Sequence, residues 1–238
     1  YTISFNGEIY NHLEIRIILN NYKKNIFWKS TSDTETILQL VARSKKGNTI
    51  SRFIDALYQI EVAYALVALT NKKLIGVRDP LGIRPLVLGQ LDGKYILTSE
   101  TCALDIIGAK FVREVENGEI VVITDNSIES IQPFPVVKAR PCIFEYIYFS
   151  RPDSIVGGLS VYQCRKAFGK ELAKESFIQA DMVIPVPDSG VPAAIGYAEQ
   201  SEIAFETGDS IRNEEEITSA FSEYEQNGSQ FFQSVDYE

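Results

Sequence analysis

The stretch from Ala63 to about Val122 constrains the fold most, because five short β-prone runs follow one another there with turn residues between them. The runs are YALVALT, KLIGVRD, PLVLG, KYILTS and EIVVIT, and the breaks contain Gly82 and the pair Asp92-Gly93. Connections this short favour antiparallel pairing, since parallel strands need crossovers of roughly a dozen residues or more. The sequence therefore predicts an antiparallel sheet in the first half of the chain.

Three helices are predicted beside these strands, one after Asn11, one across TETILQLVARS and a short one at ETCALDII. Asn11 fits the N-cap of the first helix, and Glu14 stands at the capping-box position. Apolar residues recur at helical spacing, at Leu13, Ile17 and Ile18 in the first helix and at Ile37, Leu40 and Val41 in the second. Helices beside an antiparallel sheet make residues 1–136 an α+β domain.

The pattern changes after QPFPVVKARP, so we place a domain boundary near residue 137. VYQCRKAFGKELAKES predicts a helix, ADMVIPVP a buried strand and VPAAIGYAEQ a second helix, an alternation typical of a parallel α/β sheet over residues 137–205. The apolar stripe expected on the first of these helices consists of Val161, Cys164, Phe168 and Leu172. Residues 206–238 are acidic and lack periodicity, which predicts a disordered tail.

Charge and composition exclude several classes of protein. Nine acidic residues and one basic residue follow from Glu206 onward, a balance of −8, so that residues 1–205 carry only −1 of the total of −9. No basic stripe indicates nucleic-acid binding, and no apolar run approaches the roughly 20 residues of a membrane span. The cysteines Cys102, Cys142 and Cys164 are odd in number and widely spaced, which favours a reducing, cytoplasmic location and no zinc site.

The pair Asn6-Gly7 follows the alternation of Tyr1, Ile3 and Phe5 with polar residues, which places it at the end of a predicted strand. One interpretation is the tip of a type I′ hairpin, where both residues take positive φ. The return strand would then have only about three residues, shorter than strands usually are. The other interpretation is a turn that presents the asparagine amide and the glycine N–H together.

Two further segments have both a structural and a functional interpretation. In VIPVPDSGVPAAIGYA a strand leads through Asp188, Ser189 and Gly190 to a helix with Pro192 in its first turn. The N-terminus of such a helix suits a phosphate, although any strand-to-helix turn of a parallel sheet has this pattern. Asp33 precedes the helix TETILQLVARS, where an N-cap is the simpler interpretation of the aspartate.

Taken together, these segments resemble the amidophosphoribosyltransferase family over residues 1 to about 205. The resemblance rests on FNGEIYNHLEIR, STSDTETIL, GVRDPLGIRPLVLG, TSETCALDIIGAKFVREVENGEIVVI, CIFEYIYFSRPDS and ADMVIPVPDSGVPAAIGYA. The first segment is equally similar to the glutaminase domain of asparagine synthetase, whereas the middle and later segments are specific. The chain would then be an internal piece of such an enzyme, with tyrosine rather than methionine as its first residue.

The resemblance implies a fold and an activity. Residues 1–136 would form part of an N-terminal-nucleophile (class II glutamine amidotransferase) αββα domain, and residues 137–205 the beginning of a type I phosphoribosyltransferase α/β domain. Such enzymes hydrolyse glutamine and use the ammonia to convert phosphoribosylpyrophosphate into 5-phosphoribosylamine for purine synthesis. The resemblance also implies a homo-oligomer, feedback inhibition by purine nucleotides and Mg²⁺ in the complete enzyme. Cys142 matches a ligand of an iron–sulfur cluster in some relatives, but no cluster is expected here.

The resemblance assigns roles to the candidate residues. Asn6 and Gly7 would form the oxyanion hole, Asp33 would hold the α-amino group of glutamine, and the pyrophosphate loop would be Asp188, Ser189 and Gly190; no metal ligand is assigned. The nucleophile of the family, an N-terminal cysteine, and the ribose-binding motif are not found, and Phe5 replaces a histidine. We therefore expect the 238 residues alone to be inactive. The alternatives are another class II glutaminase, such as that of asparagine synthetase, and a non-catalytic remnant.

Overall fold

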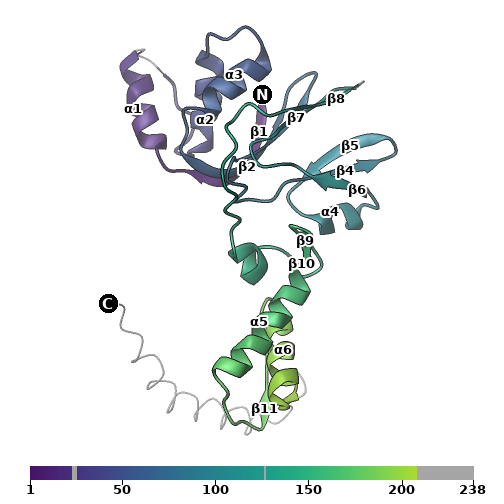
Figure 1. The fold of residues 1–238 in the computed structure, drawn as a ribbon. Helices are drawn as coiled ribbons and strands as arrows, with labels where there is room; N and C mark the ends of the chain where they lie inside the picture. The colour runs from purple at the N-terminus through teal and green to yellow at the C-terminus, as the bar shows by residue number, and fades with distance from the viewer. Residues whose placement is uncertain (23–25, 126, 208–238) are drawn as a thin grey trace. The chain divides into compact units, whose positions relative to one another are not determined.

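The computed structural model describes residues 1–22, 26–125 and 127–207 (Figure 1). It divides into two compact units, Tyr1–Val161 and Tyr162–Glu238, which we describe separately. Of the tail that was predicted to be disordered, residues 208–238 lie outside the described part. Glu206 is described, and its N–H donates to the carbonyl of Val183 at 3.0 Å. None of the helices in the described part is long and apolar enough to cross a membrane.

The two larger sheets of the first unit are antiparallel, as the short connections predict. The five-stranded sheet has the order β1-β2-β3-β7-β8 and the three-stranded sheet the order β5-β4-β6. The strands are β1 (Thr2–Ile9), β2 (Val62–Leu69), β3 (Leu74–Arg78), β4 (Val87–Leu91), β5 (Lys94–Thr98), β6 (Lys110–Glu114), β7 (Ile120–Ile123) and β8 (Ile128–Ile131). The five β-prone runs of the sequence correspond to β2, β3, β4, β5 and β7.

Alternation along β2 shows how the layers are built. Tyr64, Leu66 and Ala68 face a core shared with helices α2 (Thr34–Arg43) and α3 (Thr49–Leu57), which pack side by side (Figure 1). Ala65, on the opposite face of the strand, belongs to a second core, in which the two sheets meet. Helix α4 (Thr101–Ile106) packs against the outer face of the three-stranded sheet through Leu104. The resulting order of layers is helix, sheet, sheet, helix, the predicted αββα arrangement.

Helix α2 has the predicted apolar face, with Ile37, Leu40 and Val41 buried. The prediction for α1 (His12–Tyr22) is wrong, because Leu13, Ile17 and Ile18 are 63%, 61% and 58% exposed and Ile15 is the buried residue.

The side chain of Asn11 has a different role from the predicted N-cap. Its amide donates to the carbonyl of Gln59 at 3.0 Å and accepts from the N–H of Glu61 at 2.9 Å, so it fastens the start of α1 to the loop before β2 rather than capping the helix.

The chain after residue 137 stays with the first unit as far as Val161. The N–H groups of Arg140 and Cys142 donate to the carbonyls of Leu81 and Ile83 at 2.8 and 3.3 Å, which lays this segment along the turn after β3. A short π-helix, η1 (Glu145–Phe149), and the strands β9 (Ile155–Val156) and β10 (Leu159–Ser160) follow. The compact unit therefore extends beyond residue 137, while the family boundary expected there stays a prediction.

Within the described residues, the second unit contains α5 (Val161–Glu175), β11 (Met182–Val183), α6 (Val191–Ser201) and β12 (Ala204–Phe205). β11 and β12 pair in parallel, as the alternation of helices and strands predicts. The strand ADMVIPVP is not buried as expected, because among the described residues only Met182 and Val183 pair with another strand, β12. The side chains of Met182, Ile184 and Val186 are 43%, 42% and 79% exposed.

The predicted stripe of α5 is buried at Val161 and half-buried at Cys164, but the prediction is wrong for the rest of the helix. Phe168 and Leu172 are 42% and 52% exposed, whereas Gly169 and Ala173 are buried. A Cβ atom on Gly169 would collide with the carbonyl of Ala193, and one on Gly196 with the carbonyl of Lys166. The two helices therefore approach backbone to backbone, and this close approach selects small residues for the contact instead of large apolar ones.

We predict that Gly196→Ala lowers the free energy of unfolding by about 1–3 kcal/mol, the usual cost of overpacking. In an open helix the same change would stabilise by up to about 1 kcal/mol, so the sign of the effect tests the contact. Urea denaturation measures it. Gly47→Ala is the control, since nothing lies within 4 Å of a Cβ at that position. Stabilisation by Gly196→Ala would contradict the close approach of α5 and α6.

Candidate functional site

Asn6 and Gly7 lie inside β1 and not in a turn. The strand continues to Ile9, with Asn6 opposite Ala65 and Gly7 opposite Tyr64 of β2. The predicted hairpin tip and the predicted turn at a strand end are both wrong. The reason is that a strand distant in sequence supplies an eight-residue partner, so β1 does not have to fold back on itself.

The hydrogen bonds at the end of β1 determine where the N–H of Gly7 points. The backbone N–H of Tyr10 donates to the backbone carbonyl of Glu61 at 2.9 Å, and the backbone N–H of Asp79 donates to the backbone carbonyl of Tyr64 at 3.0 Å. Opposed residues of an antiparallel pair alternate between bonded and non-bonded, so Gly7 and Tyr64 form a non-bonded pair. The N–H of Gly7 therefore points away from β2. Among the described strands β1 is an edge strand, and this N–H faces the free edge.

Gly7 can only be glycine in this register. A Cβ atom there would collide with the carbonyl oxygen of Ala63 and would lie 3.0 Å from the Cα of Tyr64. Both are backbone atoms that cannot move without displacing β2.

Asn6 lines a cavity of about 210 Å³ in the first unit. The remaining lining residues are Arg84, Pro85, Ser99, Glu100, Glu145 and Phe149. The cavity thus combines a neutral amide, one cation and two carboxylates with an aromatic wall. The lining of the cavity is therefore mainly polar and charged.

Arg84 is one of the residues that line the cavity. Its guanidinium donates to Glu145 at 2.9 Å and lies over the ring of Phe149, with 4.5 Å between the Cζ atom and the ring centroid. The second oxygen of Glu145 accepts from the hydroxyl of Ser150 at 2.7 Å. Glu145 is only 5% exposed, so the charge-assisted bond to Arg84 compensates for its loss of water.

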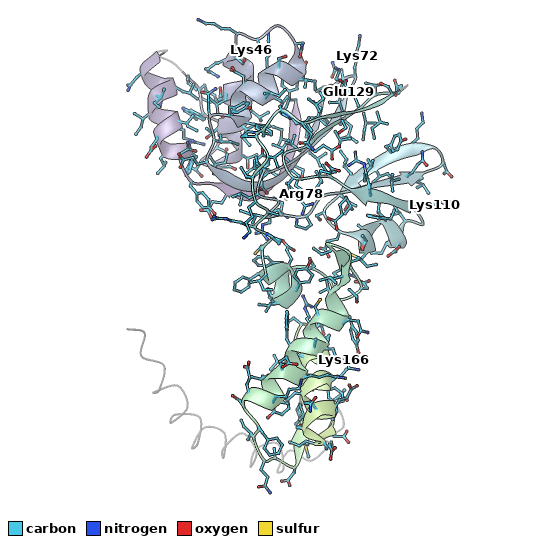
Figure 2. All side chains as sticks on the ribbon, viewed as in Figure 1. Lys46, Lys72, Arg78, Lys110, Glu129 and Lys166 are labelled. Carbon is cyan, nitrogen blue, oxygen red and sulfur yellow. The ribbon has the colours of Figure 1, made fainter. Side chains whose placement is uncertain are left out.

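Arg78 and Asp79, which precede the turn that carries Arg84, hold this turn by hydrogen bonds. Arg78, at the end of β3 (Figure 2), donates from Nε to the carbonyl of Arg84 at 3.0 Å and pairs with Glu114 at 3.3 Å. The carboxylate of Asp79 accepts from the N–H groups of Leu81 and Ile83 at 2.8 and 2.9 Å. Burial raises the pKa of Asp79, although these N–H groups oppose the shift.

Glu100, which also lines the cavity, binds the segment from Arg151 to Ser154 by hydrogen bonds. One of its oxygens accepts from the N–H of Arg151 and from the hydroxyl of Ser154, both at 2.7 Å. Local sequence patterns did not single out Glu100 or Glu145, because their partners lie 51 to 61 residues away. Only the resemblance of CIFEYIYFSRPDS to a family could have drawn attention to this region.

Asp33 caps α2 and also reaches β1. One oxygen accepts from the N–H of Thr34 at 2.7 Å, as the N-cap interpretation predicts. The other accepts from the N–H of Ile9 at 2.9 Å, on the free edge of β1 and two residues beyond Gly7. The structure thus brings Asp33 to the strand edge that carries the N–H of Gly7.

The Asp188–Gly190 loop lies in the second unit and precedes α6 as predicted. Gly190 is the N-cap, and Pro192 stands in the first turn of the helix. The N–H of Gly190 donates to the carbonyl of Val186 at 3.2 Å, and the N–H of Val191 to that of Asp188 at 3.3 Å. Ser189 is half-buried and Asp188 exposed. The role of this loop stays a prediction.

No metal site is apparent in the part of the chain that the structure describes, where no three His, Cys, Asp or Glu side chains converge. Cys142 is half-buried, and its backbone is bonded to Ile83. We therefore derive no chemical step through Mg²⁺ or an iron–sulfur cluster.

Comparison with known proteins gives a consistent result. The family model described as the glutamine amidotransferase domain matches residues 1–137. An amidophosphoribosyltransferase of Rhizobium etli is 53% identical over 216 residues, covering 89% of this chain and 43% of that protein. A chloroplastic amidophosphoribosyltransferase of Glycine max is 45% identical over 87% of this chain and 36% of its own length.

A solved structure is also similar. It is the glutamine phosphoribosylpyrophosphate amidotransferase from B. subtilis complexed with ADP and GMP, with a TM-score of 0.83 and 39% identity. The match covers 87% of this chain and 45% of that one. The chain thus spans less than half the length of these relatives.

We predict that the stability contributed by Glu35, at the start of α2, depends on acid pH. Desolvation raises the pKa of this carboxyl, but bonds from the N–H groups of Lys29 and Ser30, the Ser30 hydroxyl and the Gln39 amide lower it from 4.5 to about 2. A lowered pKa stabilises the folded state above the unfolded value, and this stabilisation is lost as the pH falls from 4.5 toward 2.

Denaturation of the wild type and of Glu35→Gln as a function of pH tests this. The difference in stability should be constant above pH 4.5 and vanish near pH 2. Glu14→Gln, at an exposed carboxylate of α1, is the control. A difference that does not change with pH would contradict the bonding of Glu35.

Proposed function

Because the chain belongs to the glutamine amidotransferase domain family, we propose that its first unit binds glutamine and takes part in hydrolysis of the side-chain amide. The observation that carries the proposal is that Asn6 lines a cavity and that the N–H of the next residue, Gly7, points to the free edge of β1. In this proposal the attacking thiolate is the N-terminal cysteine that the resemblance implies. The residues of this chain bind and polarise the amide.

Attack on the amide places negative charge on its oxygen, and preorganised donors lower the energy of that state. The amide N–H of Asn6 and the backbone N–H of Gly7 would supply two such donors. The ladder between β1 and β2 on both sides of Gly7 holds the second donor in place. A rigid donor needs no reorganisation during the reaction, which is the source of the catalytic benefit.

Asp33 would bind the α-ammonium group of the same glutamine. Its carboxylate reaches the edge of β1 at Ile9, two residues from Gly7. Two residues of extended strand span about 7 Å. This spacing is comparable to the reach of an extended glutamine from its side-chain amide to its α-amino group. One strand edge could therefore align both ends of the substrate.

For the whole protein we propose amidophosphoribosyltransferase activity, in which the ammonia reacts with phosphoribosylpyrophosphate to give 5-phosphoribosylamine for purine synthesis. The support is the identity of 39–53% to relatives of that name, which continues past the glutaminase domain into the second unit. Asp188, Ser189 and Gly190, before α6, would bind the pyrophosphate group, with Mg²⁺ as cofactor. Purine nucleotides as inhibitors, a homo-oligomer and a cytoplasmic location are part of the same proposal.

We predict that Asn6→Ala lowers kcat for glutamine hydrolysis by about 10²–10³, the usual effect of removing one oxyanion donor. The assay uses the natural polypeptide that carries this chain and measures glutamate release. Activity with ammonia instead of glutamine should change less than about twofold, because no amide is then cleaved. Asn71→Ala, in the β2–β3 turn, is the control. Equal loss of both activities would make Asn6 a structural residue.

We predict the opposite pattern for Ser189→Ala. Loss of a hydroxyl that binds the pyrophosphate group should raise KM for phosphoribosylpyrophosphate about tenfold, the effect of removing one hydrogen bond to a charged group. Basal hydrolysis of glutamine should stay unchanged. Ser201→Ala, at the other end of α6, is the control. An unchanged KM for phosphoribosylpyrophosphate would exclude Ser189 from the site.

A further inference from the structure

The segment Lys29–Ser32, which leads into α2, has its backbone groups bound by two side chains. We call it the Lys29–Ser32 loop. The carboxylate of Glu35 accepts from the N–H of Lys29 at 2.9 Å and from the N–H of Ser30 at 2.7 Å. The guanidinium of Arg16 donates to the carbonyls of Ser30 and Ser32 at 3.2 and 2.7 Å. The Glu35 carboxylate thus accepts from backbone N–H groups of the loop, and the Arg16 guanidinium donates to its backbone carbonyls.

The shape of the arginine side chain is essential to this arrangement. Arg16 projects from α1 and lies over the ring of Trp28, with 4.2 Å from Cζ to the ring centroid. The indole N–H of Trp28 in turn donates to Asn20, also in α1, at 2.9 Å. A planar guanidinium can stack on a ring and donate to two carbonyls at once, whereas a lysine ammonium is a point charge without this geometry.

The loop ends directly at Asp33. One oxygen of the Asp33 carboxylate accepts from the N–H of Thr34 at 2.7 Å and from the Thr34 hydroxyl at 3.3 Å, and the other accepts from the N–H of Ile9 at 2.9 Å. An ionised carboxylate has about four lone-pair sites, so acceptor capacity is left for a substrate cation. The direction of that capacity depends on the backbone at Ser32 and Asp33, which Arg16 holds from α1.

We propose that Arg16 and Glu35 are positioning residues, which hold Asp33 in the orientation that accepts the α-ammonium group of the substrate. This inference rests on the proposed function. Neither residue is assigned a contact with the reacting amide. Their effect is confined to recognition of the amino-acid end of glutamine, and it acts through the Lys29–Ser32 loop.

The test compares glutamine with glutaramate, which has the same amide but no α-amino group. Arg16→Lys and Glu35→Gln are assayed in the natural polypeptide that carries this chain. For each variant kcat/KM for glutamine should fall about tenfold through KM, with kcat nearly unchanged, while kcat/KM for glutaramate changes less than about twofold. Arg52→Lys is the matched control, since Arg52 also donates to a backbone carbonyl, that of Lys46 at 2.9 Å.

A second measurement separates positioning from general loss of structure. Hydrogen exchange of the N–H groups of Lys29 and Ser30 should become faster in Glu35→Gln, while exchange in β2 stays slow. Equal loss of activity toward glutamine and glutaramate, or unchanged kinetics with both substrates, would overturn the positioning role alone. If the natural polypeptide that carries this chain, without any substitution, did not hydrolyse glutamine, the proposed function and this inference would both be overturned.

Discussion

The register of β1 on β2 is the constraint on which the candidate site depends. Because Tyr64 directs its backbone groups to β3, Gly7 opposite it has no ladder bond, and its N–H faces the free edge. A shift of one residue would exchange the two sets of backbone groups and turn Asn6 to the other face of the sheet. In this register a residue with a Cβ atom at position 7 would collide with the backbone of β2.

Free N–H groups along a sheet edge are usually a hazard, since they can pair with another strand. In this molecule the Asp33 carboxylate already takes the N–H of Ile9, which ends the unpaired row on that side of Gly7. The same contact joins the N-terminus of α2 to the strand. A stabilising cap and a candidate binding group are therefore one side chain, so a substitution at Asp33 changes both.

The cavity beside Asn6 is lined by side chains from distant parts of the first unit, among them the ion pair of Arg84 and Glu145. Arg84 comes from the turn after β3, Glu145 from η1, and Glu100 precedes α4. Glu145 belongs to the segment that follows residue 137, and Glu100 accepts a hydrogen bond from Arg151 of the same segment. Binding in the cavity and the position of that segment therefore share the same side chains, a physical basis for coupling between them.

The sequence alone determined the antiparallel sheets, the apolar face of α2, the N-cap at Asp33 and the family, because short periodic runs and caps depend on neighbouring residues. It did not determine that Asn6-Gly7 lies within a strand, that Asn11 binds the loop at Gln59, or that Gly169 rather than Phe168 is buried on α5. The partners in these cases are far away in the chain, and each wins over a local preference by offering more hydrogen bonds or closer packing. The edge position of Gly7 and the cavity at Arg84 exist only once β2, β3 and η1 are assembled, so only the tertiary structure decided them.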